Sequence, residues 1–236
     1  MKKIILKKNI KPIVIIPARK NSERIKNKNI LNFYGKPLIV RTLKNLKDTK
    51  IFSKIYVSTD SKKIAEISKN CNVEVLYPRP KNLSNNKSIL LDVMSYEVKK
   101  LQKKKVEMKD VFLILPTAIF LSKKDIMKSK KSFSKKVNYV MTVIKEKKST
   151  LRNFYFEKNK LKLLASKFIN YRTQDLPSTF RDAGQLYLAD KKTWINKKKV
   201  FSAKTKVIEL NGRKYIDIDN YKDLRKAKKI FKYGKI

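Results

Sequence analysis

Short apolar runs alternate along the chain with stretches of helical spacing, which predicts strands separated by helices. Wholly apolar residues fill 13–16 and 111–115, as in strands buried on both faces of a sheet. The predicted strands are 10–16, 55–58, 73–76, 111–115 and 139–144. The predicted helices are 37–46, a segment capped by Ser61, 89–101 and a segment capped by Ser122. This order predicts an α/β fold with a mainly parallel sheet and right-handed crossovers.

The pattern changes between about residues 145 and 181. Apolar residues at 154–156 and 161–164 flank Lys158-Asn159-Lys160, which predicts a β-hairpin, and an irregular stretch follows. We interpret this part as an excursion from a single domain that spans 1–236. Exposed aromatic residues there would favour an oligomer contact, and a small local core is the alternative. The chain then returns through predicted strands at 184–188, 207–210 and 215–218 to a terminal helix.

The net charge of +42 raises the question of a nucleic-acid partner. Most of the cationic residues are lysines, and they are spread along the chain instead of forming one stripe. Lysine also lacks the planar fork with which arginine recognises bases and phosphates. The composition therefore favours a positive field that attracts anionic substrates, with no specific nucleic acid. A basic nucleic-acid-binding protein stays open as the alternative class.

Other residue types exclude several kinds of site. The chain has no histidine, which excludes histidine metal ligands and histidine general bases. Its one cysteine, Cys71, cannot form an internal disulfide and is expected to pack in the core. No apolar run reaches membrane-spanning length, and the first residues lack a signal-peptide pattern. These features predict a cytoplasmic protein with no membrane partner.

A polar loop follows the first buried strand. It begins after Pro17 and carries Arg19, Ser22, Arg24, Lys28 and Asn29. Open α/β sheets bind ligands at the carboxyl ends of their strands, and a loop this rich in hydrogen-bond donors suits a polyphosphate.

Two carboxylates lie near the other end of the chain. Asp217 and Asp219 are two residues apart in a predicted strand, so both should point to one face. Such a pair favours Mg²⁺, which typically uses one or two carboxylates together with substrate phosphates and water. The alternative is that Asp219 caps the last helix and Asp217 is merely exposed. Asp223 is interpreted as a helix-surface residue.

Several motifs occur together in one order. They are Pro17-Ala18-Arg19 through Lys28-Asn29, Val57-Ser58-Thr59-Asp60, Arg79-Pro80, Leu115-Pro116-Thr117-Ala118, Asp182-Ala183-Gly184-Gln185-Leu186-Tyr187 and Asp217-Ile218-Asp219. The set resembles the CMP-nonulosonate synthetase (acylneuraminate cytidylyltransferase) family over nearly the whole chain. The segment at 182–187 is most similar to the pseudaminic acid cytidylyltransferase branch.

The resemblance implies a Rossmann-like nucleotidyltransferase fold, a small inserted dimerisation arm and a homodimer. It implies transfer of CMP from CTP to the anomeric hydroxyl of a nonulosonic acid, with Mg²⁺ as cofactor and pyrophosphate as the second product. The implied catalytic residues are Lys28 and Arg19, and Asp217 and Asp219 are the implied metal ligands. The implied nucleotide-binding residues are Arg19, Ser22, Asn29, Arg79 and Ser88. The implied sugar-binding residues are Thr117, Arg172, Arg181, Gln185 and Tyr187.

Some positions depart from the family pattern. Glu23 places a negative charge where a lysine often meets phosphate, and Lys20 or Arg24 would have to compensate. Leu115 stands where related enzymes have glutamine or tyrosine, so a sugar contact is not expected there. The preferred acceptor is pseudaminic acid. Legionaminate, N-acetylneuraminate and a 3-deoxy-octulosonate remain as alternative acceptors.

Overall fold

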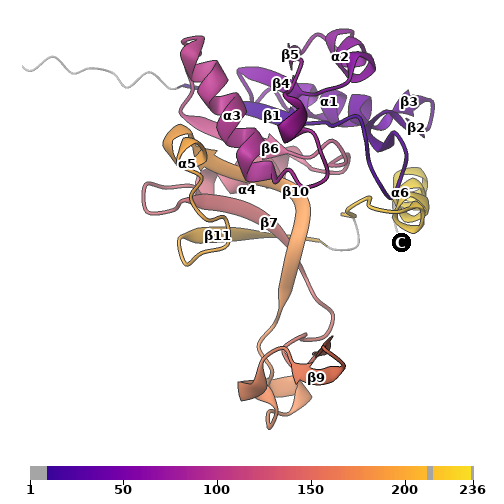
Figure 1. Cartoon of the computed structure of the whole chain (residues 1–236), viewed down its shortest axis with the longest axis vertical. Helices are drawn as coiled ribbons and strands as arrows, with labels where there is room; N and C mark the ends of the chain where they lie inside the picture. The colour runs from indigo at the N-terminus through magenta and orange to yellow at the C-terminus, as the bar shows by residue number, and fades with distance from the viewer. Residues whose placement is uncertain (1–9, 212–214, 235–236) are drawn as a thin grey trace, which may run out of the picture.

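The computed structural model describes residues 10–211 and 215–234. Their centre is a seven-stranded sheet in the order β11-β7-β10-β6-β1-β4-β5 (Figure 1). The strands are β1 (Ile13–Pro17), β4 (Lys54–Ser58), β5 (Glu74–Leu76), β6 (Asp110–Ile114), β7 (Tyr139–Lys145), β10 (Phe180–Asp190) and β11 (Thr205–Leu210). β10 runs antiparallel to its neighbours β6 and β7, and the other pairings are parallel. The predicted α/β fold with a mainly parallel sheet is confirmed.

Helices cover both faces of this sheet, which explains the wholly apolar strands. The described helices are α1 (Leu38–Thr49), α2 (Lys62–Lys69), α3 (Leu90–Lys103), α4 (Lys123–Ser132), α5 (Lys191–Ile195) and α6 (Tyr221–Tyr233). Val14 and Ile16 of β1 pack in the core that α1, α2 and α4 complete. Ile13 and Ile15 point the other way, into the core that α3 and α5 complete. Every residue of β1 is buried, so the strand is fixed at the centre of the molecule.

Polar side chains begin the helices where the sequence predicts them. Ser61 caps α2, and Ser122 forms a capping box with Asp125 at the start of α4. The last helix is capped by Asn220, and not by Asp219. Asp223 completes that capping box, so its interpretation as a plain surface residue is wrong. Its Oδ2 atom accepts from the backbone N–H groups of Asn220 (3.1 Å) and Asp219 (3.2 Å).

Two short hairpins complete the described fold. The first is β2 (Asn32–Phe33) with β3 (Lys36–Pro37), just before α1. The second is β8 (Phe154–Glu157) with β9 (Lys160–Leu163), as predicted. Lys158 and Asn159 both have positive φ angles, as a two-residue hairpin turn requires. The predicted strand at 215–218 is wrong, because these residues form neither helix nor strand.

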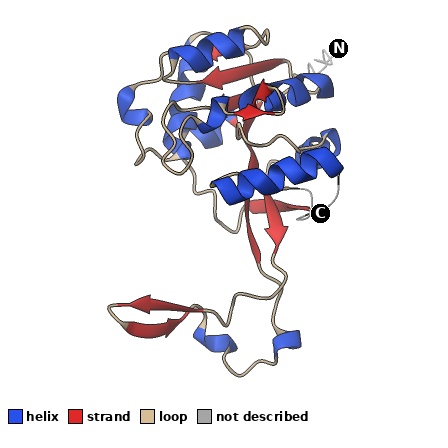
Figure 2. Ribbon diagram, turned by 90° about the vertical axis from the view of Figure 1, so that its right-hand side faces the viewer, coloured by secondary structure: helices blue, strands red, loops and turns tan. Residues whose placement is uncertain are grey.

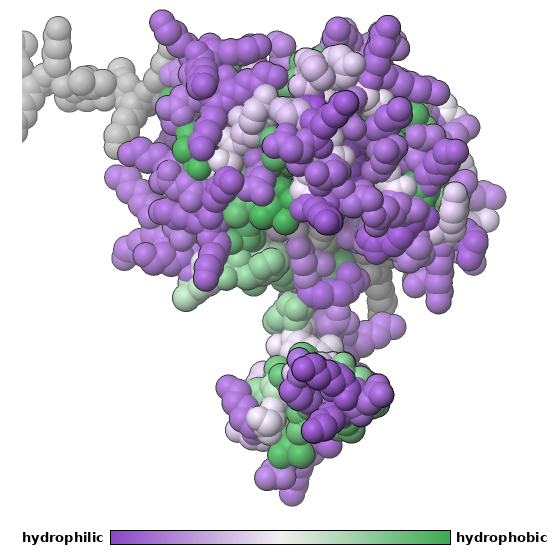
Figure 3. Space-filling model, viewed as in Figure 1, coloured by the Kyte–Doolittle hydropathy of each residue, from purple (hydrophilic) through white to green (hydrophobic). Residues whose placement is uncertain are grey.

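The second hairpin lies in an arm, residues 146–179, that leaves the sheet between β7 and β10 and projects from the body (Figures 1 and 2). The backbone bond from Glu146 N–H to Thr179 O, 2.9 Å long, closes its base. Apolar side chains gather on the arm surface (Figure 3). They include the exposed residues Phe154, Tyr155, Phe156, Leu161 and Leu164. These side chains are exposed to solvent in the single chain.

None of the helices in the described residues is long and apolar enough to cross a membrane.

Trp194 provides a test of the core between the sheet and helices α3 and α5. Its side chain is 1% exposed, packs edge-on against Tyr139 and donates from Nε1 to Val111 O at 2.9 Å. We expect Trp194→Ala to lower the free energy of unfolding by about 3–5 kcal/mol, because it leaves a cavity. Phe201→Ala, at a residue that is 73% exposed, should change it by less than about 0.5 kcal/mol. Urea denaturation measures both, and equal losses would contradict this packing.

Candidate functional site

A cavity of about 290 Å³, here called the central cavity, lies at the carboxyl ends of β1 and β6. Pro17 from the end of β1 and Leu115, Pro116 and Thr117 after β6 form part of its lining. In the seven-stranded sheet, β4 and β5 lie on one side of β1, and β6 lies on the other side. The central cavity is therefore at the topological switch point, where open α/β sheets bind ligands.

The loop after β1 forms one wall of this cavity. Arg19, Ser22 and Asn29 line it, as the sequence predicts for a ligand-binding loop. Buried Asn29 donates from Nδ2 to the backbone oxygen of Arg19 at 2.9 Å, which fixes the loop. The Arg19 guanidinium donates to Asn85 O (3.1 Å) and to Asn86 Oδ1 (3.0 Å). Arg19 therefore connects this loop to the next wall.

The second wall comes from the loop between β5 and α3. Arg79, 4% exposed, and Ser88 both line the cavity. Arg79 donates from Nε to Ser84 Oγ at 3.1 Å, and its backbone N–H donates to Thr59 O at 2.9 Å. The Ser88 hydroxyl contacts Asn82 O and Asn85 Oδ1, each at 2.9 Å. This wall is a hydrogen-bonded polar loop with a buried guanidinium beside it.

Sequence reasoning did not identify Asn85 and Asn86, which line the central cavity, although the run of asparagine and serine before α3 was a signal for them. It also did not identify the buried carboxyl of Glu97, which lines neither cavity. Glu97 is fully buried, and the Ser58 hydroxyl donates to its Oε1 at 2.7 Å. Burial raises the pKa of the Glu97 carboxyl, and the positive charge of Arg79 is among the influences that lower it again. Helical spacing places Glu97 on the same face of α3 as the buried residues Val93 and Leu101, so the apolar pattern was a signal that this carboxyl is buried.

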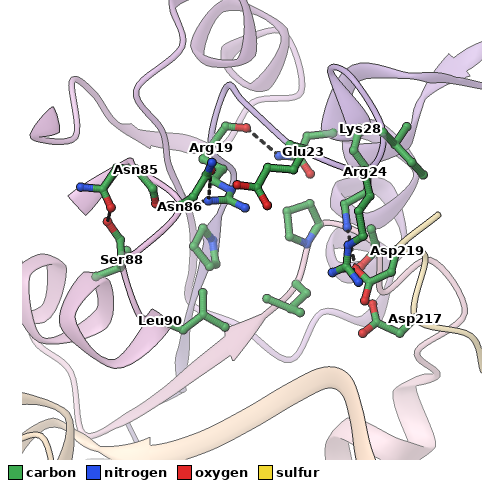
Figure 4. Close-up of a pocket in the computed structure, with 18 of the residues that line it drawn as sticks. Arg19, Glu23, Arg24, Lys28, Asn85, Asn86, Ser88, Leu90, Asp217 and Asp219 are labelled. Carbon is green, nitrogen blue, oxygen red and sulfur yellow. Dashed lines mark hydrogen bonds and ion pairs between the residues drawn. The ribbon is translucent and has the colours of Figure 1, made fainter. Parts of the chain in front are cut away.

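Across the cavity from Arg19 lies a cluster of charged side chains (Figure 4). Lys28 donates from Nζ to Ile218 O at 2.7 Å and to Asp219 Oδ1 at 3.2 Å. The Arg24 guanidinium reaches the same Asp219 oxygen at 3.0 Å. Lys28 and Arg24 therefore neutralise Asp219. Lys28 also fixes the backbone of the carboxylate segment, which we define as residues 215–219.

Asp217 and Asp219 both line the central cavity, although the carboxylate segment forms no strand. Ile218 between them is fully buried, so its neighbours point outward to the cavity. The predicted shared face is therefore present for a different reason, namely the burial of one intervening side chain. Burial, followed by the negative charge of Asp219, raises the pKa of Asp217 to about 6.

The chemistry of this pair fits Mg²⁺, whose ligands are carboxylate, phosphate and water oxygens. The described residues contain no group of three His, Cys, Asp or Glu side chains arranged around a metal position. Two carboxylates are the usual protein contribution when a magnesium ion takes its other ligands from substrate phosphates and water. The pair thus suits a magnesium ion that takes its remaining ligands from phosphates and water.

A second cavity, about 1380 Å³, adjoins the central one and shares Arg24, Asp217 and Asp219 with it. Arg181 lines it and forms an ion pair from Nε to Glu146 Oε1 at 3.1 Å. Lys145, Lys147, Lys148, Lys226 and Lys229 also line it. Its described lining has seven cationic side chains and four acidic ones, so the lining carries a net positive charge that suits an acidic ligand.

The predicted sugar-binding residues do not all meet at these cavities. Thr117 lines the central cavity, and Arg181 lines the second. Arg172 is exposed on the arm and lines neither. Gln185, 1% exposed, and Tyr187, 9% exposed, line neither cavity and bond to other protein groups. In this structure the side chains of Gln185 and Tyr187 are buried and bonded within the protein, and their assignment to the sugar stays a prediction.

Comparisons with known proteins agree with this geometry. Residues 13–236 match the family model described as Cytidylyltransferase. A Campylobacter jejuni protein named pseudaminic acid cytidylyltransferase is 30% identical over 226 residues, which cover 94% of this chain and 97% of that protein. A Helicobacter pylori protein, named both pseudaminic acid cytidylyltransferase and UDP-2,4-diacetamido-2,4,6-trideoxy-beta-L-altropyranose hydrolase, is 29% identical over 218 residues. That match covers 92% of this chain and 42% of the Helicobacter protein.

Solved structures show the same fold. CMP:2-keto-3-deoxy-manno-octonic acid synthetase, solved with CTP, superposes with a TM-score of 0.68 at 14% identity. The superposition covers 95% of this chain and 99% of that one. At this identity the likeness supports the fold alone. The match over residues 13–236, which takes in both walls of the central cavity and the carboxylate segment, shows that the chain belongs to the cytidylyltransferase family.

Proposed function

We propose that this protein transfers CMP from CTP to the anomeric hydroxyl of a nonulosonic acid, pseudaminic acid, and releases pyrophosphate. The observation that carries the proposal is the central cavity, which joins a donor-rich loop and a carboxylate pair at the switch point of the sheet. The alignment with the Campylobacter pseudaminic acid cytidylyltransferase supports the choice of acceptor, because it spans nearly the full length of both chains.

In the reaction, the anomeric oxygen forms a bond to the α-phosphorus of CTP. The bond from that phosphorus to the oxygen that bridges the α- and β-phosphates breaks, pyrophosphate leaves, and the hydroxyl proton is released. Such transfers depend on positioning and charge neutralisation more than on covalent catalysis. The cationic groups around the cavity are suited to that task.

In this proposal the cytidine binds at one end of the central cavity, and the phosphates extend toward the other end. Arg79 and Ser88 line the wall proposed for the cytidine, where buried polar groups can distinguish one base from another. Arg19, Ser22 and Asn29 lie along the path proposed for the phosphates. Lys28 and Arg24 lie at the far end beside Asp219, where they would neutralise the departing pyrophosphate (Figure 4).

Asp217 and Asp219 are proposed to hold Mg²⁺, which when bound supplies positive charge to the triphosphate. Asp219 is already paired with Lys28 and Arg24, so these cations would orient it as a ligand. Glu23 lines the central cavity together with Arg19 and Arg24. In this proposal the charges of these two cations offset the negative charge of Glu23, which departs from the family pattern.

The acidic sugar is proposed to enter through the second cavity. Arg181 there offers a guanidinium that can bind a sugar carboxylate bidentately. Thr117 faces the central cavity from the end of β6. Because Arg172 lies on the arm, it could serve a sugar site only in a second copy of the chain.

The arm is proposed to mediate a homodimer. Its exposed aromatic and aliphatic side chains include Phe156, which is 76% exposed, and Leu161, which is 57% exposed. Exposed apolar patches of this kind mark interaction sites. The proposed location of the protein is the cytoplasm.

The assay that tests the function offers CTP, Mg²⁺ and a panel of acidic sugars, and measures pyrophosphate release and the CMP-sugar product. We expect pseudaminic acid to be used with a higher kcat/KM than legionaminate, N-acetylneuraminate or 3-deoxy-octulosonate. Equal use of the panel would contradict the choice of acceptor. Absence of turnover, with CTP binding that disappears at moderate salt, would favour general adhesion to polyanions.

The phosphate wall is tested with Arg19→Ala and Lys28→Ala. Each removes a charged hydrogen-bond donor, and we expect kcat/KM for CTP to fall about ten- to a hundredfold. The matched control is Lys103→Ala with Lys104→Ala, two exposed lysines on the far end of α3. An equal loss in the control would show that the general field matters more than the site.

Asp217→Asn should abolish turnover and at the same time stabilise the metal-free protein above about pH 6. The native pKa of Asp217 is raised to about 6 from its ordinary value near 3.8, so ionisation opposes folding. The free energy of unfolding of the wild type therefore falls as pH rises from about 4 to about 6, and that of the variant does not fall for this reason. Thermal unfolding at pH 4, 5, 6 and 8 measures the difference. Asp175→Asn, on the exposed arm, is the control, and a variant that tracks the wild type at every pH would contradict the shift.

A further inference from the structure

The part of β10 next to the carboxylate segment departs from regular strand pairing. We define residues 182–187 as the bulge segment, because the register with β7 shifts between Asp182 and Tyr187. Gly184 in this segment has a φ angle of +57°. A Cβ atom on Gly184 would lie 2.5 Å from Asp217 Oδ2 and 2.9 Å from Asp217 Cγ. The Asp217 carboxylate therefore occupies space that exists only because residue 184 has no side chain.

Gln185 connects the bulge segment to the backbone beside Asp217. Its Nε2 atom donates to Ile216 O at 3.4 Å and to Ala183 O at 3.2 Å. On the other side of Asp217, Lys28 donates to Ile218 O at 2.7 Å. The carbonyl groups of both residues that flank Asp217 are thus held by side chains from distant parts of the chain.

Two hydrogen bonds to the Asp182 carboxylate fix the shape of the bulge segment. Asp182 Oδ1 accepts from the backbone N–H of Gly184 at 3.0 Å. The Tyr187 hydroxyl donates to Asp182 Oδ2. Burial and the Asp182 charge raise the pKa of the Tyr187 phenol, so the hydroxyl stays protonated and remains a donor. Three of the residues that resemble a sugar-binding motif therefore bond to one another or to the carboxylate segment.

We propose that the bulge segment positions the Asp217 carboxylate for its cation, with Gly184 giving it room and Gln185 holding the adjacent peptide. The segment supports the metal ligand and does not contact the sugar. This inference rests on the proposed function, because it assumes that Asp217 binds a divalent cation. Groups that orient metal ligands typically change metal affinity 10- to 100-fold when they are altered.

Gly184→Ala is the first test, with Gly35→Ala as the matched control. Gly35 also has a positive φ angle, of +77°, but a Cβ there would meet nothing within 4 Å. The control therefore shows the cost of the backbone angle alone. We expect Gly184→Ala to weaken Mn²⁺ binding, followed by electron paramagnetic resonance, about 10- to 100-fold. Gly35→Ala should leave Mn²⁺ binding within twofold.

The contact itself is tested by thermal unfolding without metal. Gly184→Ala should lower the melting temperature more in the wild type than in an Asp217→Ala background, because the second change removes the atoms that clash. Equal losses in both backgrounds would overturn the role of Gly184. This readout needs neither substrate nor cation.

Gln185→Met separates positioning from sugar recognition, because it keeps the side-chain length and removes the donor. We expect a higher KM for Mg²⁺ with an unchanged ratio of kcat/KM between pseudaminic acid and N-acetylneuraminate. A lost sugar preference with an unchanged KM for Mg²⁺ would overturn the inference in favour of a sugar contact. If the wild type itself does not bind Mn²⁺, the proposed metal site fails and this inference with it. If the Gly184 and Gln185 variants bind Mn²⁺ as tightly as the wild type does, the inference fails and the metal site stands.

Discussion

The close placement of like charges at Asp217 is the constraint on which the rest of the site depends. Burial and the charges of Asp219 and Asp182 oppose its ionisation, while Lys28 and Arg24 favour it. The ionised form of a carboxyl in this position is less favourable than in water, and the neighbouring cations Lys28 and Arg24 offset part of that penalty. Titratable groups with perturbed pKa values cluster at functional sites.

The groups that hold this carboxyl come from both ends of the chain. Lys28 follows β1, yet it bonds to the oxygen of Ile218, 190 residues later. The sheet makes this contact possible by fixing β1 at its centre, and α6 anchors the other end through the ring contact of Phe231 with Phe33, whose centroids are 5.2 Å apart. Because Asp223 also caps α6 and bonds to the Asp219 N–H, the docking of the last helix and the geometry of the carboxylate segment are coupled.

The fold, the polar loop after β1 and the pair Asp217 and Asp219 could be predicted from the sequence, because each of them leaves a local signal. Buried β1 has a continuous apolar run, and Ser61 and Ser122 stand at the helix starts they cap. The role of Gln185 could not be read from the sequence, because the same amide suits a sugar hydroxyl or a backbone carbonyl, and its neighbour Ile216 O is known only from the fold. Helical spacing places Glu97 on the buried face of α3, but it does not reveal the hydrogen-bond partner, because Ser58 is 39 residues away.

The net charge of +42 acts on anions in solution, whereas the side chains that line the central cavity act only on a bound ligand. Scattered lysines raise the local concentration of any anion, and salt screens this effect within about 10 Å. Inside the cavity, however, Glu23, Asp217 and Asp219 stand among the cations Arg19, Arg24 and Lys28, so the lining is mixed in sign. A bare polyanion would gain from the cations and lose to the carboxylates. In the proposed function, a nucleotide that brings a divalent cation satisfies both sets, and the mixed lining can therefore select what the general field only attracts.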